Sequence, residues 1–244
     1  MGISRTIAAC VAAAATCILA GCSAPTYPVS STLDIDNYPR TIQQAIAPAT
    51  TQSDSAVNRA IIIRHTDGTS SRCTAAFTAK DQEGNPLAVT SGHCIKTLGD
   101  YVYRHGAPIS TVMSTDKRYR AGATSTVDYG TFQTSMTNNV ATQTTVEEDD
   151  NSFSSTFRIT SVEAPQRGMP VCSYGSTSGW RCGIITRVEE TFFVVAGMLT
   201  DKGDSGGGAY YGDSVVGITS ASNSDTTFFQ RADVVVEREG LTLN

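Results

Sequence analysis

The sequence predicts an all-β fold, built as a sandwich or a barrel. Short runs of β-branched, aromatic and small apolar residues recur along the chain from Ala56 onward. Turn residues separate these runs, as at Asp67–Gly68 and Glu83–Pro86, and helical periodicity is scarce. The length of 244 residues permits one large β domain or two small domains that share a core.

The β-prone runs divide into two halves, with one helix at the end of the chain. Residues 232–239 are the best helix candidate, and Gly240 marks its end. An acidic stretch at 147–150 is either a linker between the halves or a solvated loop. We therefore expect an N-terminal β unit over 56–150 and a C-terminal β unit with the helix over 151–244. The expected strands lie at 59–63, 74–79, 87–90, 101–103, 130–133, 157–159, 183–188, 191–195 and 214–218.

Composition and charge exclude several classes of protein. A hydrophobic content of 40% with 17% charged residues argues against disorder over most of the length. The net charge of −5, without a basic cluster, argues against a nucleic-acid partner. The chain has no Cys-x-x-Cys spacing and no nearby histidine pair, so a metal site is not expected.

The first 21 residues have the pattern of an export signal. Arg5 supplies a positive charge before an uncharged, alanine-rich run that is short for a membrane-spanning helix. Residues 19–22, Leu-Ala-Gly-Cys, resemble a bacterial lipobox, in which the cysteine receives a lipid and the signal is cut just before it. The alternative is a plain signal cut near Ala24, with Cys22 incidental.

The lipobox predicts where the protein resides. Lipid chains on Cys22 would anchor an exported chain to the outer face of the bacterial cell membrane. Residues 22–55 are rich in Ser, Thr, Ala and Pro, which is typical of a tether between anchor and domain. The expected organisation is a lipoprotein signal peptide at 1–21 followed by a lipid-anchored tether at 22–55.

Four of the seven cysteines lie beyond the tether, and an even number in an exported chain predicts two disulfides. Four cysteines allow three pairings. Nearness in sequence favours Cys73–Cys94 and Cys172–Cys182. The alternative for each cysteine is a buried free thiol.

Ser205 is the candidate nucleophile, because glycines surround it in the run Gly-Asp-Ser-Gly-Gly-Gly at 203–208. Glycines permit a tight turn and a close approach of substrate backbone. The N–H groups of Gly203 and Ser205 would then form an oxyanion hole, which requires donors about 3 Å from the developing negative oxygen. The alternative is a Gly-rich turn with an incidental serine.

His93 is the candidate general base. It lies in Thr-Ser-Gly-His-Cys at 90–94, between an apolar run and an expected disulfide cysteine that would fix its backbone. Histidine titrates near neutral pH, which suits proton transfer. The other histidines, His65 and His105, lack comparable surroundings, and a purely structural His93 is the alternative.

Asp128 is the candidate partner of His93. It opens a β-prone run in Val-Asp-Tyr-Gly at 127–130, where a buried carboxylate would accept the Nδ1–H of the histidine and select its tautomer. Asp116 and Asp100 are rivals in more polar settings. A strand-edge aspartate without a catalytic role is the alternative.

Taken together, the motifs at 90–94, 127–130 and 203–208 resemble those of the chymotrypsin-like serine proteases, in the same chain order. The closest resemblance is to the bacterial streptogrisin and α-lytic protease group, and it extends over residues 56–244. It implies two six-stranded antiparallel β-barrels with a short C-terminal helix and an active site between the barrels. It also implies cleavage of a polypeptide substrate by His93, Asp128 and Ser205 without a cofactor. We expect a monomer.

The resemblance also places the substrate pocket. Met198, Leu199 and Thr200 would form its base. No aspartate stands at Leu199, as a preference for basic residues would need, and no histidine stands at Thr219, as a preference for glutamate would favour. We therefore expect cleavage after uncharged, small to medium apolar residues. The expected pocket wall consists of Ser220, Ala221 and Ser222.

Two departures from the family pattern bear on Asp204, which precedes the nucleophile. Ser173 stands where bacterial relatives place an arginine that pairs with this aspartate, so Arg181, Arg167 or Tyr174 would have to replace it. A disulfide near the pocket is also absent. These departures favour, as the alternative function, a weak or inactive protease-fold lipoprotein that acts as a binding or scaffold module.

Overall fold

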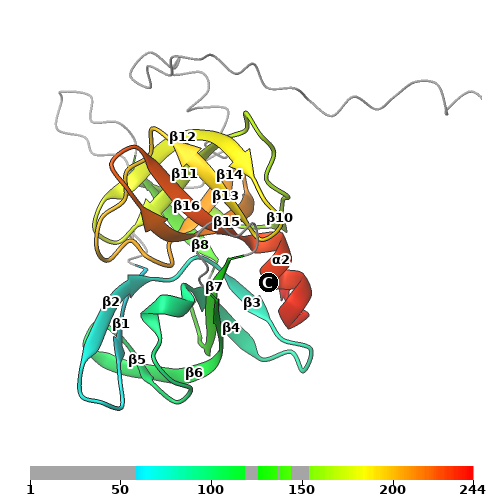
Figure 1. The fold of residues 1–244 in the computed structure, drawn as a ribbon. Coiled ribbons are helices and arrows are strands. Elements are labelled where there is room, and N and C mark those ends of the chain that lie inside the picture. Colours follow the sequence, from blue (N-terminus) through cyan, green and yellow to red (C-terminus); the bar gives the residue numbers. More distant parts are fainter. Residues whose placement is uncertain (1–58, 119–125, 137, 144–153, 244) are drawn as a thin grey trace, which may run out of the picture.

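The computed structural model describes residues 59–118, 126–136, 138–143 and 154–243. Within these ranges the chain forms two large sheets, one above the other in Figure 1, and a short helix at the C-terminal end. The predicted signal, the tether with Cys22 and the acidic stretch at 147–150 lie outside the described residues. No helix in the described part is long and apolar enough to span a membrane.

The first sheet has the strand order β17-β3-β4-β7-β6-β5-β1-β2 in the described chain. Strands β2 and β3 stand toward opposite ends of this order, and the chain between them bridges the two ends, because Ala75 donates its N–H to Arg59 O and Ala76 donates its N–H to Val89 O. Strand β17 comes from the C-terminal end and pairs with β3. The strands are β1 (Ala60–Arg64), β2 (Ser70–Thr74), β3 (Thr78–Lys80), β4 (Pro86–Thr90), β5 (Tyr101–Arg104), β6 (Ala107–Arg118), β7 (Val127–Gln133) and β17 (Thr242–Leu243).

The second sheet has the order β10-β15-β14-β11-β12-β13-β16, and an additional pairing of β15 with β16 closes it into a barrel. Strand β10 joins it in parallel with β15. A separate two-stranded sheet pairs β8 (Asn139–Gln143) with β9 (Ser154–Arg158). The strands of the second sheet are β10 (Ser161–Val162), β11 (Pro170–Gly175), β12 (Gly179–Val188), β13 (Phe192–Ala196), β14 (Gly208–Tyr211), β15 (Ser214–Ser222) and β16 (Thr226–Arg231).

The predicted all-β class, with two barrels and a C-terminal helix, is confirmed. Helix α2 (Ala232–Glu239) ends at Gly240, whose φ of 60° is the left-handed conformation that glycine adopts at helix ends. Beyond the six-stranded pattern, β17 extends the first barrel and β10 the second. Both additions come from short segments that carry no β signal of their own.

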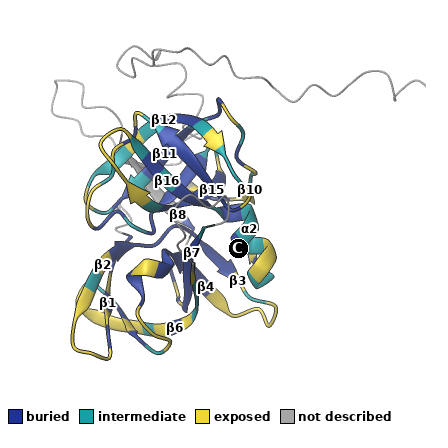
Figure 2. Ribbon diagram, viewed as in Figure 1, coloured by how far each residue is buried: buried dark blue, intermediate teal, exposed yellow. Residues whose placement is uncertain are grey.

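Three apolar clusters form the core, one in each barrel and one between them. Ile61 and Phe132 belong to the first barrel, and Phe193 and Phe229 to the second. Burial follows the strand faces that point inward, while most residues of β6 are exposed or half-buried (Figure 2). The cluster between the barrels contains Phe77, Val89 and Tyr129 from the first, Tyr210 and Ile218 from the second, and Val235 from α2.

Candidate active site

His93 lies in a short 3-10 turn, η2 (Gly92–Cys94), directly after the buried strand β4. A side chain at Gly92 would meet Asp116 O and Tyr129 O, each 2.8 Å from an added Cβ. Glycine therefore lets the turn pack against β6 and β7. The Cys73–Cys94 disulfide ties the same turn to β2, so packing and a covalent bond both position the backbone of His93.

Asp128, on β7, holds this histidine from two directions. Its Oδ1 accepts the backbone N–H of His93 at 2.7 Å, and its Oδ2 lies 2.8 Å from His93 Nδ1. The hydroxyl of Ser220 donates to the same Oδ2 at 2.5 Å. The sequence placed Ser220 only in the pocket wall, so its contact with Asp128 was missed.

The environment of Asp128 keeps its carboxyl group ionised at neutral pH. Burial acts to raise the pKa of Asp128, but the hydrogen bonds from His93 and Ser220 outweigh burial and hold this pKa below its ordinary value. The Asp128 N–H donates to the Gln230 side chain of β16 at 3.0 Å. Gln230, a second missed residue, thereby connects Asp128 to the second barrel.

Ser205 lies in the loop before β14, at the contact between the barrels. Thr74 of β2 donates its N–H to Ser205 O at 2.8 Å. Cys94 Sγ, which is in the disulfide and carries no proton, lies 3.9 Å from the same oxygen. Ser205 is therefore held beside the residue that follows His93.

The Ser205 hydroxyl and the His93 ring are not joined by a hydrogen bond in the described structure. Among the described residues, His93 bonds through Nδ1 to Asp128, and no hydrogen bond joins Ser205 Oγ to His93 Nε2. Such bonds are often long in ligand-free enzymes and tighten only when substrate binds. The missing bond therefore does not by itself exclude the pair from proton transfer.

The backbone around Ser205 leaves two donors available. In the described chain, the N–H groups of Gly203 and Ser205 donate to no protein acceptor, although the N–H groups of Asp204, Gly206 and Gly207 all do. Gly203 has a φ of 104°, a conformation that non-glycine residues rarely adopt. These are the two groups that the sequence assigned to an oxyanion hole.

The structure corrects the expected partner of Asp204. The carboxylate is fully buried, and its Oδ1 accepts the N–H groups of Thr177 and Ser178 at 2.8 and 2.9 Å. Its Oδ2 accepts the Asp201 N–H at 2.8 Å. Arg181, one of the predicted partners, donates instead to Trp180 O. Arg167 and Tyr174 make no hydrogen bond to it in the described part either.

A chain turn brings these N–H groups to Asp204. The β11–β12 hairpin folds over the carboxylate, and a side chain at Gly175 would come within 2.3 Å of Asp204 Cγ. Backbone N–H donors satisfy a buried carboxylate without a cation. The second predicted disulfide, Cys172–Cys182, joins the two strands of this hairpin, so both predicted disulfides are present.

Known proteins of similar sequence cover part of the chain. Streptogrisin-C of Streptomyces griseus is 33% identical over 90 residues, which are 31% of this chain and 20% of that protein. Streptogrisin-D of the same organism is 28% identical over 178 residues, which are 67% of this chain and 42% of that protein. The chain thus spans less than half the length of either relative. No family model matches it.

Solved structures of similar shape cover most of the chain. The Nocardiopsis protease has a TM-score of 0.59 at 23% identity, over 79% of this chain and all of the other, 100%. The Cellulomonas bogoriensis chymotrypsin has a TM-score of 0.56 at 23% identity, over 79% and 99%. The fold is chymotrypsin-like. At this identity the likeness establishes the fold alone.

In this chymotrypsin-like fold, the predicted pocket residues lie on both sides of Gly203–Ser205 in the sequence, with 198–200 before it and 220–222 after it. Met198 is buried, and Leu199 is half-exposed, with 50% of its surface accessible. Ser222 donates its hydroxyl to Thr200 O at 2.9 Å, and Gly197 donates its N–H to Asp225 O at 3.4 Å. Hydrogen bonds therefore join the segment 197–200 to the loop at 222–225.

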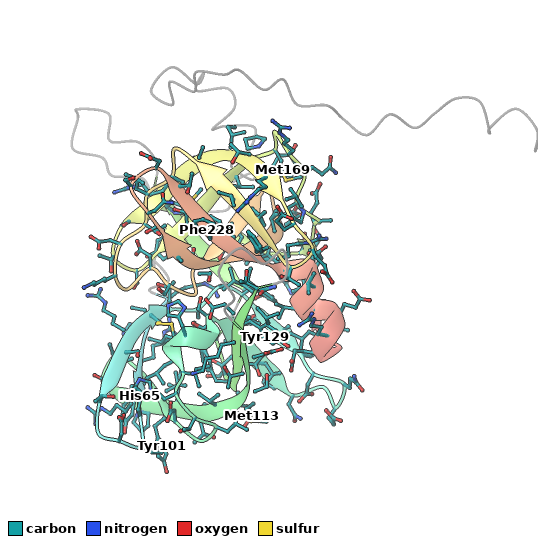
Figure 3. All side chains as sticks on the ribbon, viewed as in Figure 1. His65, Tyr101, Met113, Tyr129, Met169 and Phe228 are labelled. Carbon is teal, nitrogen blue, oxygen red and sulfur yellow. A yellow bond between two sulfur atoms is a disulfide. The ribbon has the colours of Figure 1, made fainter. Side chains whose placement is uncertain are left out.

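A second Ser-His-Asp arrangement, which no sequence pattern had indicated, lies in the first barrel of the chymotrypsin-like fold. His65 Nδ1 lies 2.7 Å from Asp100 Oδ2, and His65 Nε2 lies 2.8 Å from Ser71 Oγ. Figure 3 places His65 low in this barrel, away from the second barrel. The His65 side chain is 1% exposed, whereas that of His93 is 37% exposed. Of these two histidines, only His93 is accessible to a substrate.

The buried arrangement has a structural role. Asp100 also accepts the N–H groups of Lys96 and Thr97 at 2.9 and 3.1 Å. It therefore connects the loop after His93 to the β1–β2 hairpin. Within the described ranges, no three His, Cys, Asp or Glu side chains gather as metal ligands would.

Proposed function

We propose that the chain is a serine endopeptidase that hydrolyses peptide bonds through an acyl-enzyme intermediate. The observation that carries this proposal is the pairing of an accessible histidine with a buried carboxylate, beside a serine flanked by two unengaged N–H donors. The likeness to streptogrisins and to solved proteases supports it. Each group matches one requirement of acyl transfer.

The first half-reaction forms the acyl-enzyme. Ser205 Oγ attacks the carbonyl carbon, its proton passes to His93 Nε2, and the carbonyl electron pair becomes an oxyanion. The N–H groups of Gly203 and Ser205 stabilise that oxyanion. When the C–N bond breaks, the His93 Nε2 proton goes to the leaving amine, and Asp128 stabilises the transient imidazolium.

The second half-reaction releases the product. Water attacks the acyl carbon while His93 accepts one of its protons, and the tetrahedral intermediate forms again in the same oxyanion hole. Collapse breaks the bond to Ser205 Oγ, which takes the proton back from His93. The carboxylic acid leaves, and the enzyme returns to its starting state without a cofactor.

A fluorophosphonate probe and peptide hydrolysis together test the proposal. We expect the probe to label the wild-type chain at Ser205, as mass spectrometry of the adduct would detect. We expect Ser205→Ala to abolish labelling and lower kcat by about 10⁶-fold. Ser71→Ala is the matched control, because Ser71 belongs to the buried arrangement, and it should label like wild type. Labelling at Ser71 alone would contradict the assignment.

The alternative is a protease-fold scaffold that does not turn over. The missing hydrogen bond between Ser205 Oγ and His93 Nε2 in the described structure is the observation that favours it. A chain that neither reacts with the probe nor cleaves peptides would support this alternative over the proposed enzyme.

For the substrate, we propose cleavage after uncharged, small to medium apolar residues. The half-exposed Leu199 and the neutral hydroxyls of Thr200 and Ser222 support this specificity, because they offer no charge to pair with a basic or acidic side chain. Cleavage profiles on a peptide library measure it directly. A strong preference for arginine or lysine would contradict the proposal.

For location, we propose that the protein is anchored by lipid at Cys22 on the outer face of the cell membrane. The support is the Leu-Ala-Gly-Cys pattern at 19–22. In cells given an alkyne-labelled fatty acid, the wild-type chain should acquire the label and Cys22→Ala should not. Equal labelling of the two chains would contradict the anchor site.

A further inference from the structure

The direction of the Gly203 N–H depends on what holds the carbonyl before it. In a trans peptide the C=O and the N–H point in opposite directions, so Lys202 O and the Gly203 N–H turn together. Thr177 Oγ1 donates to Lys202 O at 2.9 Å. Because glycine rotates more freely than other residues, a fixed Lys202 carbonyl matters more here than elsewhere.

Thr177 packs directly against this peptide. A Cβ added to Gly203 would lie only 2.4 Å from Thr177 Oγ1. The hydroxyl therefore occupies the space beside the Gly203 Cα. This contact leaves the Lys202–Gly203 peptide little room to turn over.

Ser176 and Ser178, on either side of Thr177, form hydrogen bonds to Gly203 and Asp204, the two residues after Lys202. Ser176 Oγ donates to Gly203 O at 3.0 Å, and Thr74 Oγ1 of the first barrel donates to it at 2.8 Å. The N–H groups of Thr177 and Ser178 bind the Asp204 carboxylate. Three consecutive residues, 176–178, thus hold three consecutive residues, 202–204.

We propose that Thr177 is a positioning residue, whose hydroxyl aims the Gly203 N–H into the oxyanion hole. The proposal rests on the proposed peptidase function. The backbone N–H of Thr177 donates to the Asp204 carboxylate, and every substitution of Thr177 except proline keeps this hydrogen bond. The side-chain hydroxyl is therefore separable from the Asp204 contact, and Thr177 itself is exposed.

The test compares Thr177→Val with Thr177→Ser in the full mature chain. Valine keeps the shape and removes the hydroxyl, whereas serine keeps the hydroxyl. On a peptide substrate we expect Thr177→Val to lower kcat by about tenfold or more with KM nearly unchanged, because only the transition state carries the oxyanion. Thr177→Ser should stay within about threefold of wild type. Thr111→Val, at an exposed position on β6, is the control and should match wild type.

A second readout separates positioning from a general structural role. A peptide aldehyde forms a tetrahedral adduct whose oxygen occupies the oxyanion hole, so its affinity should fall in proportion to kcat/KM in Thr177→Val. The unfolding midpoint should stay close to that of wild type. If Thr177→Val does not fold, Thr177→Ala removes the same hydroxyl and carries the same expectation.

The possible outcomes distinguish a failure of the role proposed for Thr177 from a failure of the proposed peptidase function. Wild-type kcat in Thr177→Val, or equal losses in the valine and serine variants, would overturn the role of the hydroxyl while the peptidase function stands. An inert wild-type chain would overturn the peptidase function and, with it, this inference.

Discussion

Asp116 on β6 and Asp128 on β7 lie on two neighbouring, paired strands, yet their surroundings differ. Asp128 is buried and accepts from His93, whereas Asp116 is partly exposed and lies 3.6 Å from Arg238 Nη1. In Asp128→Asn the amide would favour the wrong histidine tautomer, so we expect kcat to fall by about 10⁴-fold. Asp116→Asn should stay within about threefold of wild type. Steady-state kinetics measure both variants, and equal losses would contradict the role of Asp128.

Gly206 is required by packing as well as by backbone conformation. Its φ is 85°, and an added Cβ would lie 2.1 Å from Thr90 Oγ1 and 2.3 Å from Thr74 O. Gly212 also has a positive φ, 58°, but an added Cβ there meets nothing within 4 Å. We expect Gly206→Ala to lower the free energy of unfolding by about 3 kcal/mol.

The Gly212→Ala control should cost about 1 kcal/mol, since only its backbone conformation is strained. Chemical denaturation of the two variants and the wild type gives both values. Similar losses at the two sites would show that packing of Gly206 against the first barrel adds nothing.

For single residues, the sequence was most informative where the chemical role requires a particular type of side chain. His93, Asp128 and Ser205 could be proposed because few residue types act as base, orienting carboxylate and nucleophile. The hydrogen-bond partners of Asp204 could not be predicted, because they are backbone N–H groups, which every residue type except proline carries. The roles of Ser220 and Gln230 were also hidden, since each depends on a contact across many residues of sequence.

Among the elements, strands with one buried face were predictable and strands without one were not. In β1, Ile61 and Ile63 point inward, and the apolar run was recognised. Strand β6 is the longest in the described chain, yet Val112 is its only buried residue in the part whose side chains are described. Its Ser, Thr and Lys residues give no alternating apolar signal. Pairing with β5 and β7 determines this strand instead.

Helix α2 links the second barrel to the first through Glu239. Its carboxylate accepts from Tyr129 Oη at 2.6 Å, on the strand β7 that also carries Asp128, and from Ser114 Oγ of β6 at 3.0 Å. Glu239→Ala leaves the buried Tyr129 hydroxyl without this acceptor, so we expect a loss of about 1–3 kcal/mol of unfolding free energy. Glu237→Ala, on the exposed side of α2, should change it by less than about 0.5 kcal/mol.

Thermal or chemical denaturation of Glu239→Ala, Glu237→Ala and the wild type measures these changes in unfolding free energy. If the losses are equal, the helix contributes through its apolar side alone and the Glu239 contacts contribute nothing measurable.

At the scale of the whole molecule, the two barrels are joined at several points around the candidate site. Thr74 contacts the oxyanion loop, Gln230 contacts Asp128, and Tyr210 Oη donates to Ala76 O at 2.6 Å. Chain order alone predicted that the catalytic motifs come from both barrels. How the barrels meet depends on these polar contacts and on the shared apolar cluster, which no local pattern reveals.

Buried carboxylates in the first barrel should make the stability of the whole molecule sensitive to acid. Burial acts to raise the pKa of Asp100, but hydrogen bonds from His65, Lys96 and Thr97 outweigh burial and hold this pKa far below its ordinary value. The pKa of Asp128 is lowered for the same kind of reason. A carboxyl group whose pKa is lower in the folded state stabilises the fold above its unfolded-state pKa, about 4, and loses that contribution as pH falls.

The free energy of unfolding should therefore be higher at about pH 6 than at about pH 3. Asp100→Asn removes the largest of these contributions, because an amide cannot accept from all the N–H groups around it. We expect the variant to lose about 2–4 kcal/mol at about pH 6 and distinctly less at about pH 3, where the wild-type carboxylate is itself being protonated. Urea denaturation at both pH values measures the difference, with the exposed Asp225→Asn as a surface control. A gap between wild type and Asp100→Asn that does not narrow in acid would mean that the contribution of Asp100 does not come from its charge.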